Sequence, residues 1–223
     1  MNHITTLNQY NDGITCFGPA STYEAGPNAY KGEHIVLEDQ VVDLAGVQGQ
    51  DGGIDCVDGA SVTLRRCVVR NVGKASLVGN ADMQPPAAVT VEMHDCVVEN
   101  FGRRAPEAQC GAQVLMVRCT IRNWGVKSSF DVKAFGALAN GTGTKIRAVN
   151  CRFEQGGFWQ TGFWNFFVDL GNHIGQAVKD RGVLGLTWRD FIPGVCRGLT
   201  AVNGGEVEAI RCTKNKWWIV IDG

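Results

Sequence analysis

The sequence predicts an all-β fold in which short parallel strands stack into a solenoid. One pattern occurs three times between residues 51 and 125, as VTLRRCVVRNVG, VTVEMHDCVVENFG and VLMVRCTIRNWG. Each copy has alternating apolar residues, then a cysteine, then an Asn four places after that cysteine. Repeats of roughly 20–30 residues, with no convincing helical segment between the copies, indicate a solenoid. Because all copies read in one direction, we expect parallel stacking at about 4.8 Å per coil.

Composition is consistent with one domain, residues 1–223, of about eight coils. The chain has 29 Gly and 6 Pro, and 44% of its residues are hydrophobic, which indicates many turns around a sizeable core. The net charge of −1 offers no bulk attraction to nucleic acid or to an anionic membrane. No apolar run approaches the ~18–20 residues of a membrane span. We therefore expect neither partner, and we expect a monomer.

The chain divides into a cap, a set of core coils and a second end region. Residues 1–33 carry little pattern, and we expect them to cap one end, with a short strand at 14–17. The core coils are predicted over 34–157. The first of them is HIVLEDQVVDLAG (34–46), with Gln40 in the place of the cysteine, and the last is IRAVNCRFEQGG (146–157).

Residues 158–223 are predicted to form aromatic-rich terminal coils and a cap. The segment FWQTGFWNFFVDL (158–170) is densely aromatic. It is either a cap that covers the open end of the solenoid or a platform on which sugars stack. A short helix is expected at 172–182, and two more coils are expected at 184–194 and 207–218.

Cysteine and asparagine occupy fixed places in the repeat. The chain has nine cysteines, an odd number, so they cannot all pair with one another. Equivalent positions in successive coils hold Cys67, Cys96, Cys119 and Cys151. We expect these four to form a buried row of free thiols, with disulfides as the alternative. One turn holds Asn71, Asn100 and Asn123. An Asn tolerates left-handed backbone geometry and can bond to the turns above and below, so a structural ladder is predicted.

Two aspartates four residues apart, Asp51 and Asp55, are the first candidates for a functional site. Glu38 is expected in the preceding coil, about one stacking step away, and Asp39 is its substitute if the register differs by one residue. Oxygen ligands from adjacent coils favour a hard cation such as Ca²⁺. On their own, these residues would be interpreted as solvated turn carboxylates.

The order of motifs from Glu38 to Phe153 resembles that of the pectate lyases of polysaccharide lyase family one. HIVLED and DGGIDC are similar to that family's acidic strand and the DGLIDI after it. RNVGKASLVGNAD (70–82) is similar to its "nHxKxMLiGhsD" segment, and VTVEMHDCVVENFGRRAPEAQCG (89–111) to its strand ending in "QRxPRxRxG". NW at 123–124 and NCRF at 150–153 match its last two motifs. The resemblance covers about half of the chain.

This resemblance implies a secreted right-handed parallel β-helix that cleaves polygalacturonate (pectate) by Ca²⁺-dependent β-elimination. The N-terminus, MNHITTLNQYNDG, lacks the basic start and apolar core of a signal peptide. Carried over by position, the Ca²⁺ ligands are Glu38, Asp51 and Asp55. The catalytic base is Arg104, and the residues that face the substrate are Lys74, Arg103 and Gln109. Calcium and Lys74 on the C6 carboxylate would stabilise the charge that develops as the C5 proton leaves.

The chain departs from the family at several of these positions. Glu107 and Gln109 stand where the motif has its later arginines. Loss of the second arginine removes a charge-assisted contact of about 1.5–3 kcal/mol. Asp39 replaces the histidine that follows the first acid. An arginine base is also demanding, because a guanidinium normally keeps its proton unless neighbouring cations oppose the charge.

Two other functions compete with the lyase. The first is a non-catalytic carbohydrate-binding or structural β-helix, such as a segment of a virion spike or fibre. The lost arginine and the missing signal peptide favour it, whereas the retained Lys74, Arg104, Asp51 and Asp55 favour the lyase. The second is a hydrolase of the polygalacturonase type, which requires clustered aspartates. The sequence disfavours this hydrolase because it has neither an Asp-Asp pair nor a Gly-His-Gly motif.

Overall fold

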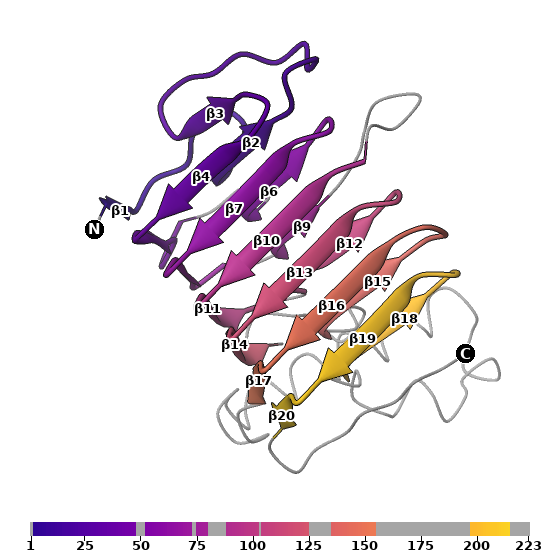
Figure 1. Ribbon diagram of the computed structural model, residues 1–223. Coiled ribbons are helices and arrows are strands. Elements are labelled where there is room, and N and C mark those ends of the chain that lie inside the picture. Colours follow the sequence, from indigo (N-terminus) through magenta and orange to yellow (C-terminus); the bar gives the residue numbers. More distant parts are fainter. Residues whose placement is uncertain are drawn as a thin grey trace, which may run out of the picture.

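All regular elements that the structure describes are β-strands arranged in three parallel sheets. The computed structural model describes residues 2–47, 52–72, 75–79, 88–102, 104–124, 135–154 and 197–214. Within these ranges the strands pair in parallel, and no helix is long and apolar enough to cross a membrane. The expectation of an all-β fold with parallel stacking is therefore confirmed (Figure 1).

The three sheets are named A, B and C. Sheet A has, in spatial order, β1 (Asn2–Ile4), β5 (Gln40–Asp43), β8 (Val68–Arg70), β11 (Val97–Phe101), β14 (Thr120–Trp124), β17 (Arg152–Glu154) and β20 (Thr213–Lys214). Sheet B has β3 (Ala29–Lys31), β2 (Asp12–Phe17), β6 (Gly52–Val57), β9 (Ala75–Gly79), β12 (Glu107–Gln109), β15 (Phe135–Asn140) and β18 (Arg197–Val202). Sheet C has β4 (Ile35–Glu38), β7 (Ser61–Arg65), β10 (Thr90–His94), β13 (Gln113–Val117), β16 (Lys145–Val149) and β19 (Glu206–Ile210).

The chain visits the sheets in a fixed order, and we call one passage through B, C and A a circuit. Strands β6, β7 and β8 make one circuit, and β9, β10 and β11 make the next (Figure 1). Pairing is in register, so Val91 of β10 lies beside Val62 of β7 on one side and Val114 of β13 on the other. Equivalent positions of successive circuits therefore form continuous rows along the stack.

Inward-facing rows form the core. In sheet C one such row consists of Ile35, Val62, Val91, Val114 and Ile146, all of them buried. Because side chains alternate between the two faces of a strand, the residues between these positions face outward and are mostly polar or charged. This alternation is the pattern that the repeat displays in the sequence.

The predicted row of free thiols is confirmed. The four side chains are buried and form no disulfide: Cys67, Cys96, Cys119 and Cys151. Each thiol lies 3.4–3.5 Å from a main-chain oxygen of the preceding circuit, which satisfies its weak donor without a disulfide. A hydrogen bond with the neighbouring Cys96 and burial together raise the pKa of Cys67, so this thiol stays protonated.

The asparagine ladder is confirmed as well. Asn71, Asn100 and Asn123 have φ values of 60°, 54° and 56°. The amide of Asn123 donates to Oδ1 of Asn100 at 3.1 Å, and the amide of Asn71 donates to Oδ1 of Asp43 at 2.7 Å. The side chains thus connect adjacent circuits where the backbone takes the left-handed conformation.

A second left-handed ladder, at the turn between sheets C and A, was not predicted. Its members all have φ values between 51° and 55°: Asp39, Arg66, Asp95, Arg118, Asn150 and Arg211. Asp and Asn tolerate this conformation better than Arg does. Two arginines of this row, Arg66 and Arg118, hydrogen-bond to the aspartates of the preceding circuits. Arg66 donates twice to Asp39 at 2.8 Å, and Arg118 donates twice to Asp95 at 2.7 Å.

Other expectations about the ends of the chain have mixed outcomes. The strand expected at 14–17 is confirmed as part of β2, and the coil at 34–46 is confirmed as β4 and β5. The segments at 158–170, 172–182 and 184–194 lie outside the described residues. The division into a cap, core coils and terminal coils within one domain stays a prediction.

Candidate functional site

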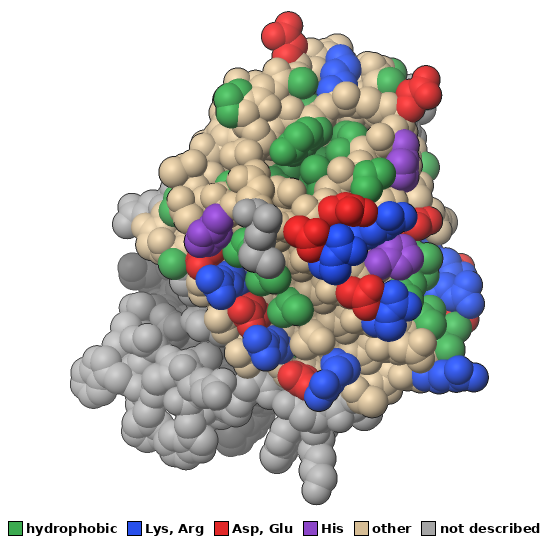
Figure 2. Space-filling model, turned by 60° about the vertical axis from the view of Figure 1, so that its left-hand side comes forward, with side chains coloured by type: hydrophobic (Ala, Val, Ile, Leu, Met, Phe, Trp, Pro, Cys, Tyr) green, Lys and Arg blue, Asp and Glu red, His purple; other side chains and the backbone are tan. Residues whose placement is uncertain are grey.

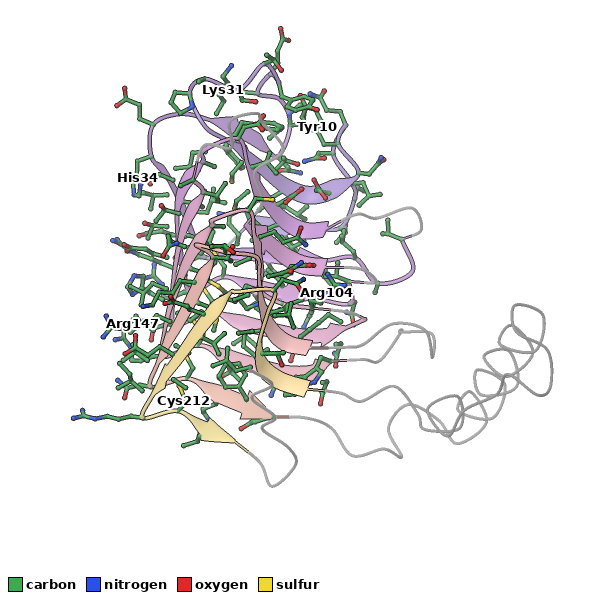
Figure 3. All side chains as sticks on the ribbon, turned by 90° about the vertical axis from the view of Figure 1, so that its right-hand side faces the viewer. Tyr10, Lys31, His34, Arg104, Arg147 and Cys212 are labelled. Atoms are coloured by element: carbon green, nitrogen blue, oxygen red, sulfur yellow. The ribbon has the colours of Figure 1, made fainter. Side chains whose placement is uncertain are left out.

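Sheet B carries most of the predicted site residues that the structure describes. Asp55 lies in β6, Gln109 in β12, and Arg104 shortly before β12. Figure 3 shows Arg104 on the side of the molecule opposite His34 and Arg147, which belong to the sheet C side. Three predicted residues, Asp51, Lys74 and Arg103, lie outside the described residues.

Arg104 is bound to a buried carboxylate. Ala108 faces the core, so its neighbours Glu107 and Gln109 point to the outer face of sheet B. Glu107 is nevertheless only 5% exposed. Its Oε1 accepts hydrogen bonds from Nη1 of Arg104 and from Nε2 of Gln109. The guanidinium of Arg104 is therefore engaged by a carboxylate, whereas a catalytic base needs a nitrogen that can approach the substrate proton.

The sequence analysis did not anticipate the contacts of Glu107. Glu107 was interpreted as standing at the first of the motif's two lost arginines, but it binds the two predicted site residues on either side of it. The spacing contained the signal: Glu107 begins a short strand, an Arg lies three residues before it, and a polar residue, Gln109, lies two residues after it. Glu107 therefore organises a local polar cluster of Arg104, Glu107 and Gln109, which we call the Glu107 cluster.

The structure does not bring Glu38 and Asp55 together. Glu38 lies in β4 of sheet C, in register with Arg65, whereas Asp55 lies in β6 of sheet B. The Glu38 carboxylate is bound by Arg65 at 3.1 Å and by Arg66 at 3.5 Å. Its substitute Asp39 is bound by Arg66. Neither acid is available to a Ca²⁺ site on sheet B.

Within the described ranges, no group of three or more His, Cys, Asp or Glu side chains is arranged to hold a metal ion. The acids expected to form the Ca²⁺ site are thus divided between two sheets, with Asp51 outside the described residues. The repeat itself contained this information, because Glu38 aligns with Arg65 in the repeat. Asp55 precedes Arg65 by ten residues and so belongs to another strand of the circuit.

A second polar cluster lies beside Asp55. Thr15 of β2 is in register with Asp55. The Thr15 hydroxyl donates to Oδ2 of Asp12 at 2.9 Å and accepts from the Asn8 amide at 2.9 Å. Asp12 is 2% exposed and Thr15 is 2% exposed. The row continues through Val78 of β9 to Glu107, so both polar clusters lie along one line of sheet B.

The outer faces of sheets A and C carry charges that pair between circuits. On sheet A, Arg70 binds Asp43 at 2.8 Å, and Arg122 binds Glu99. On sheet C, Arg147 binds Glu208 at 3.1 Å and Lys145 binds Glu206 at 3.4 Å. Figure 2 shows such acidic and basic side chains next to one another down the visible face. These charges stabilise the stack and are engaged with one another.

One shallow hollow lies on sheet A rather than near the Glu107 cluster. Its volume is about 370 Å³, and it is lined by His3, Val41, Val68 and Arg70. The valines are outward-facing residues of adjacent strands. The hollow is mostly apolar and contains none of the predicted site residues.

No family model, no curated protein and no solved structure matches this chain.

Proposed function

We propose that the three sheets form a right-handed parallel β-helix that binds an acidic polysaccharide along the outer face of sheet B without cleaving it. The handedness follows from the strong preference of parallel strand crossovers for the right-handed connection. The fixed order in which the chain visits the sheets supports the helix. From β2 to β18 the face crosses six neighbouring strands, or about 24 Å at ~4.8 Å per step, which suits a linear polymer.

The contrast between the outer faces carries this proposal. Sheets A and C pair their charges from circuit to circuit, which leaves few groups for a ligand. On sheet B, Asp55 and Glu107 lie in one register row and Gln109 and Asn140 in another, and the hydrogen bond between Gln109 and Glu107 stays within one segment of the chain. A few convergent polar groups on an extended face are what a sugar chain needs for hydrogen bonding. The partly exposed Arg104 and the motifs shared with pectate lyases favour an anionic chain.

The Glu107 cluster is the reason for proposing binding rather than cleavage. Arg104 would be the base of β-elimination, but its guanidinium is engaged by the Glu107 carboxylate. The described acids also supply no complete Ca²⁺ site. The second candidate remains the Ca²⁺-dependent lyase, which is favoured by the occurrence of Asp55 and Arg104 on the same sheet, two strands apart.

One experiment separates the two candidates. Purified protein is run through gels containing polygalacturonate, and the absorbance of protein–polygalacturonate mixtures is followed near 232 nm with Ca²⁺ and then with chelator. We expect retardation in the gel and no rise in absorbance. Arg104→Ala should reduce the retardation. The apparent affinity calculated from it should fall about three- to tenfold, because a charge-assisted contact is lost.

Arg118→Ala is the matched control, since it removes the same charge from the exposed ladder. It should leave binding unchanged. A Ca²⁺-dependent rise in absorbance that Arg104→Ala abolishes would establish the lyase instead. Absence of retardation would contradict polysaccharide binding altogether.

A further inference from the structure

Three aromatic rings form a cluster at the N-terminal end of sheet B that neither candidate function uses. Phe17 is the last residue of β2 and is 2% exposed. Tyr10 contacts it edge-on, with ring centroids 4.9 Å apart, and Tyr23 stacks on it at 5.2 Å with an interplanar angle of 25°. Tyr23 is 49% exposed. One face of the Tyr23 ring is thus covered by Phe17, Tyr10 lies 5.6 Å away in an edge-to-face arrangement, and about half of the Tyr23 residue remains exposed.

The loop that carries Tyr23 is held in place by hydrogen bonds. The Ser21 hydroxyl donates to the buried Asp58 carboxylate at 2.6 Å and accepts from the main-chain N–H of Tyr23 at 3.2 Å. The Tyr10 hydroxyl donates to the main-chain oxygen of Glu24 at 2.8 Å. Contact between chain segments is also close at Gly18, where a Cβ would lie 2.2 Å from the main-chain oxygen of Asp58. The ring is therefore oriented before any ligand arrives, which lowers the entropic cost of binding.

Lys31 is bound to the loop that carries Tyr23. Lys31 of β3 is in register with Phe17, and its ammonium donates to the main-chain oxygen of Ser21 at 2.6 Å. None of the described carboxylates forms an ion pair with Lys31, in contrast to the cations of sheets A and C. The cluster thus combines a half-exposed aromatic ring with a positive charge whose partner among the described residues is a neutral main-chain oxygen.

We propose that Tyr23 and Lys31 form a subsite for one uronic acid residue of the bound polysaccharide. The negative face of the tyrosine ring attracts the weakly positive C–H groups on one side of a pyranose. The ammonium of Lys31 forms a charge-assisted hydrogen bond with the uronate carboxylate. The proposal rests on the polysaccharide binding proposed above. It specifies where one end of the binding face lies and that a uronic acid is bound there.

The position of the subsite agrees with a chain that lies along sheet B. Phe17 is in register with Val57 of β6, and the same sheet continues through β9 to Gln109 of β12. From β2 to β12 are three strand steps, or about 14 Å. A single polysaccharide chain can therefore contact both the Tyr23–Lys31 subsite and the Glu107 cluster.

The test compares binding of polygalacturonate and of its fully methyl-esterified, uncharged form by isothermal calorimetry. Tyr23→Ala should weaken binding of both polymers about tenfold, because both lose the stacking surface. Tyr23→Phe keeps the ring and should bind as the wild type does. Lys31→Met should weaken only the charged polymer, about three- to tenfold, and should reduce the salt dependence of its binding.

Val36→Ala is the matched control, because Val36 is 48% exposed on sheet C. It should change neither affinity. If the wild type binds polygalacturonate and Tyr23→Ala binds it equally well, the subsite is wrong while the proposed function stands. If Lys31→Met weakens both polymers equally, the assignment to a uronate carboxylate is wrong. If the wild type binds neither polymer, both proposals fail. Circular dichroism of each variant shows that the fold is retained.

Discussion

Glu99 and Glu107 are both buried glutamates held by arginine, yet their partners come from different places. Glu99 is bound by Arg122 of the following circuit, with Nε at 2.6 Å, and lies 3.9 Å from Nη1 of Arg70 in the preceding one. Glu107 binds Arg104 and Gln109, which belong to its own segment. The contacts of Glu99 connect circuits and stabilise the stack. The contacts of Glu107 connect nothing along the stack, so they organise a local cluster.

This difference shows how to recognise a site in a repetitive fold. A charge whose partner lies in the equivalent position of the next circuit is explained by stacking. The row Asp43, Arg70, Glu99 and Arg122 alternates in sign along sheet A and has this explanation. A buried charge outside such a row is not explained by stacking. Glu107, in the Glu107 cluster on sheet B, is a charge of this kind.

Replacing Glu107 should give the largest effect on stability. Glu107→Ala leaves the partly buried Arg104 without its carboxylate, and Nε of Arg104 has no hydrogen-bond partner within the described residues. We expect the free energy of unfolding to fall by about 3 kcal/mol, as measured by urea denaturation. In Glu107→Ala/Arg104→Met the unpaired charge is gone, and part of the loss should be recovered. A double variant no more stable than Glu107→Ala would contradict a local ion pair.

Replacing Glu99 should have a smaller effect. Glu99→Ala removes contacts to two arginines, but Arg70 keeps Asp43 and Arg122 is 44% exposed to water. We expect a loss of about 1–2 kcal/mol in the same urea experiment. Polygalacturonate binding should not change, whereas Glu107→Ala should alter both stability and binding. A binding defect in Glu99→Ala would remove the distinction between a stacking residue and a site residue.

The rows could be predicted from the sequence because each is a repeat of one residue type at one position. The thiols at Cys67 and Cys96 and the amides at Asn71 and Asn100 are found by aligning the copies. The charge row at Asp39 and Arg66 was missed because its members alternate in sign, and the alignment shows no shared residue type.

The site was harder to predict because it does not repeat. The resemblance to a lyase assigned roles to Glu38 and Asp55 in one site, but their places in the circuit put them on different sheets. The Tyr10–Phe17–Tyr23 cluster occurs once, in a segment without periodicity, so only its three-dimensional packing reveals it. Periodicity identifies residues that share a register row, but it gives neither the separation of Glu38 from Asp55 nor the packing of the three rings.

The smallest predicted difference is in the acid sensitivity of stability. It is between a half-buried carboxylate, Asp43, and an exposed one, Asp95, both of which are paired with arginine. Burial alone would raise the pKa of Asp43, but hydrogen bonds from Asn71 and Arg70 outweigh it and lower that pKa. Hydrogen bonds from Arg118 lower the pKa of Asp95, which is exposed. A carboxylate with a lowered pKa stabilises the fold above its unfolded pKa of about 3.9, and this contribution is lost as the pH falls through the lower folded value.

Stability to urea should therefore be constant from neutral pH to about pH 5 and should decline below about pH 4. Asp43→Asn should flatten this decline, because the Asp43 side chain is only 16% exposed and its ion pair is screened less by water and salt. Asp95→Asn should flatten it less, and only at low ionic strength, because solvent screens exposed pairs. Equal effects of the two substitutions would show that the exposure of an ion pair does not determine its contribution to the free energy of unfolding. The stability of the stack would then depend on how many ion pairs connect the circuits and not on how deeply each pair is buried. A buried carboxylate such as Glu99 would contribute no more than an exposed one.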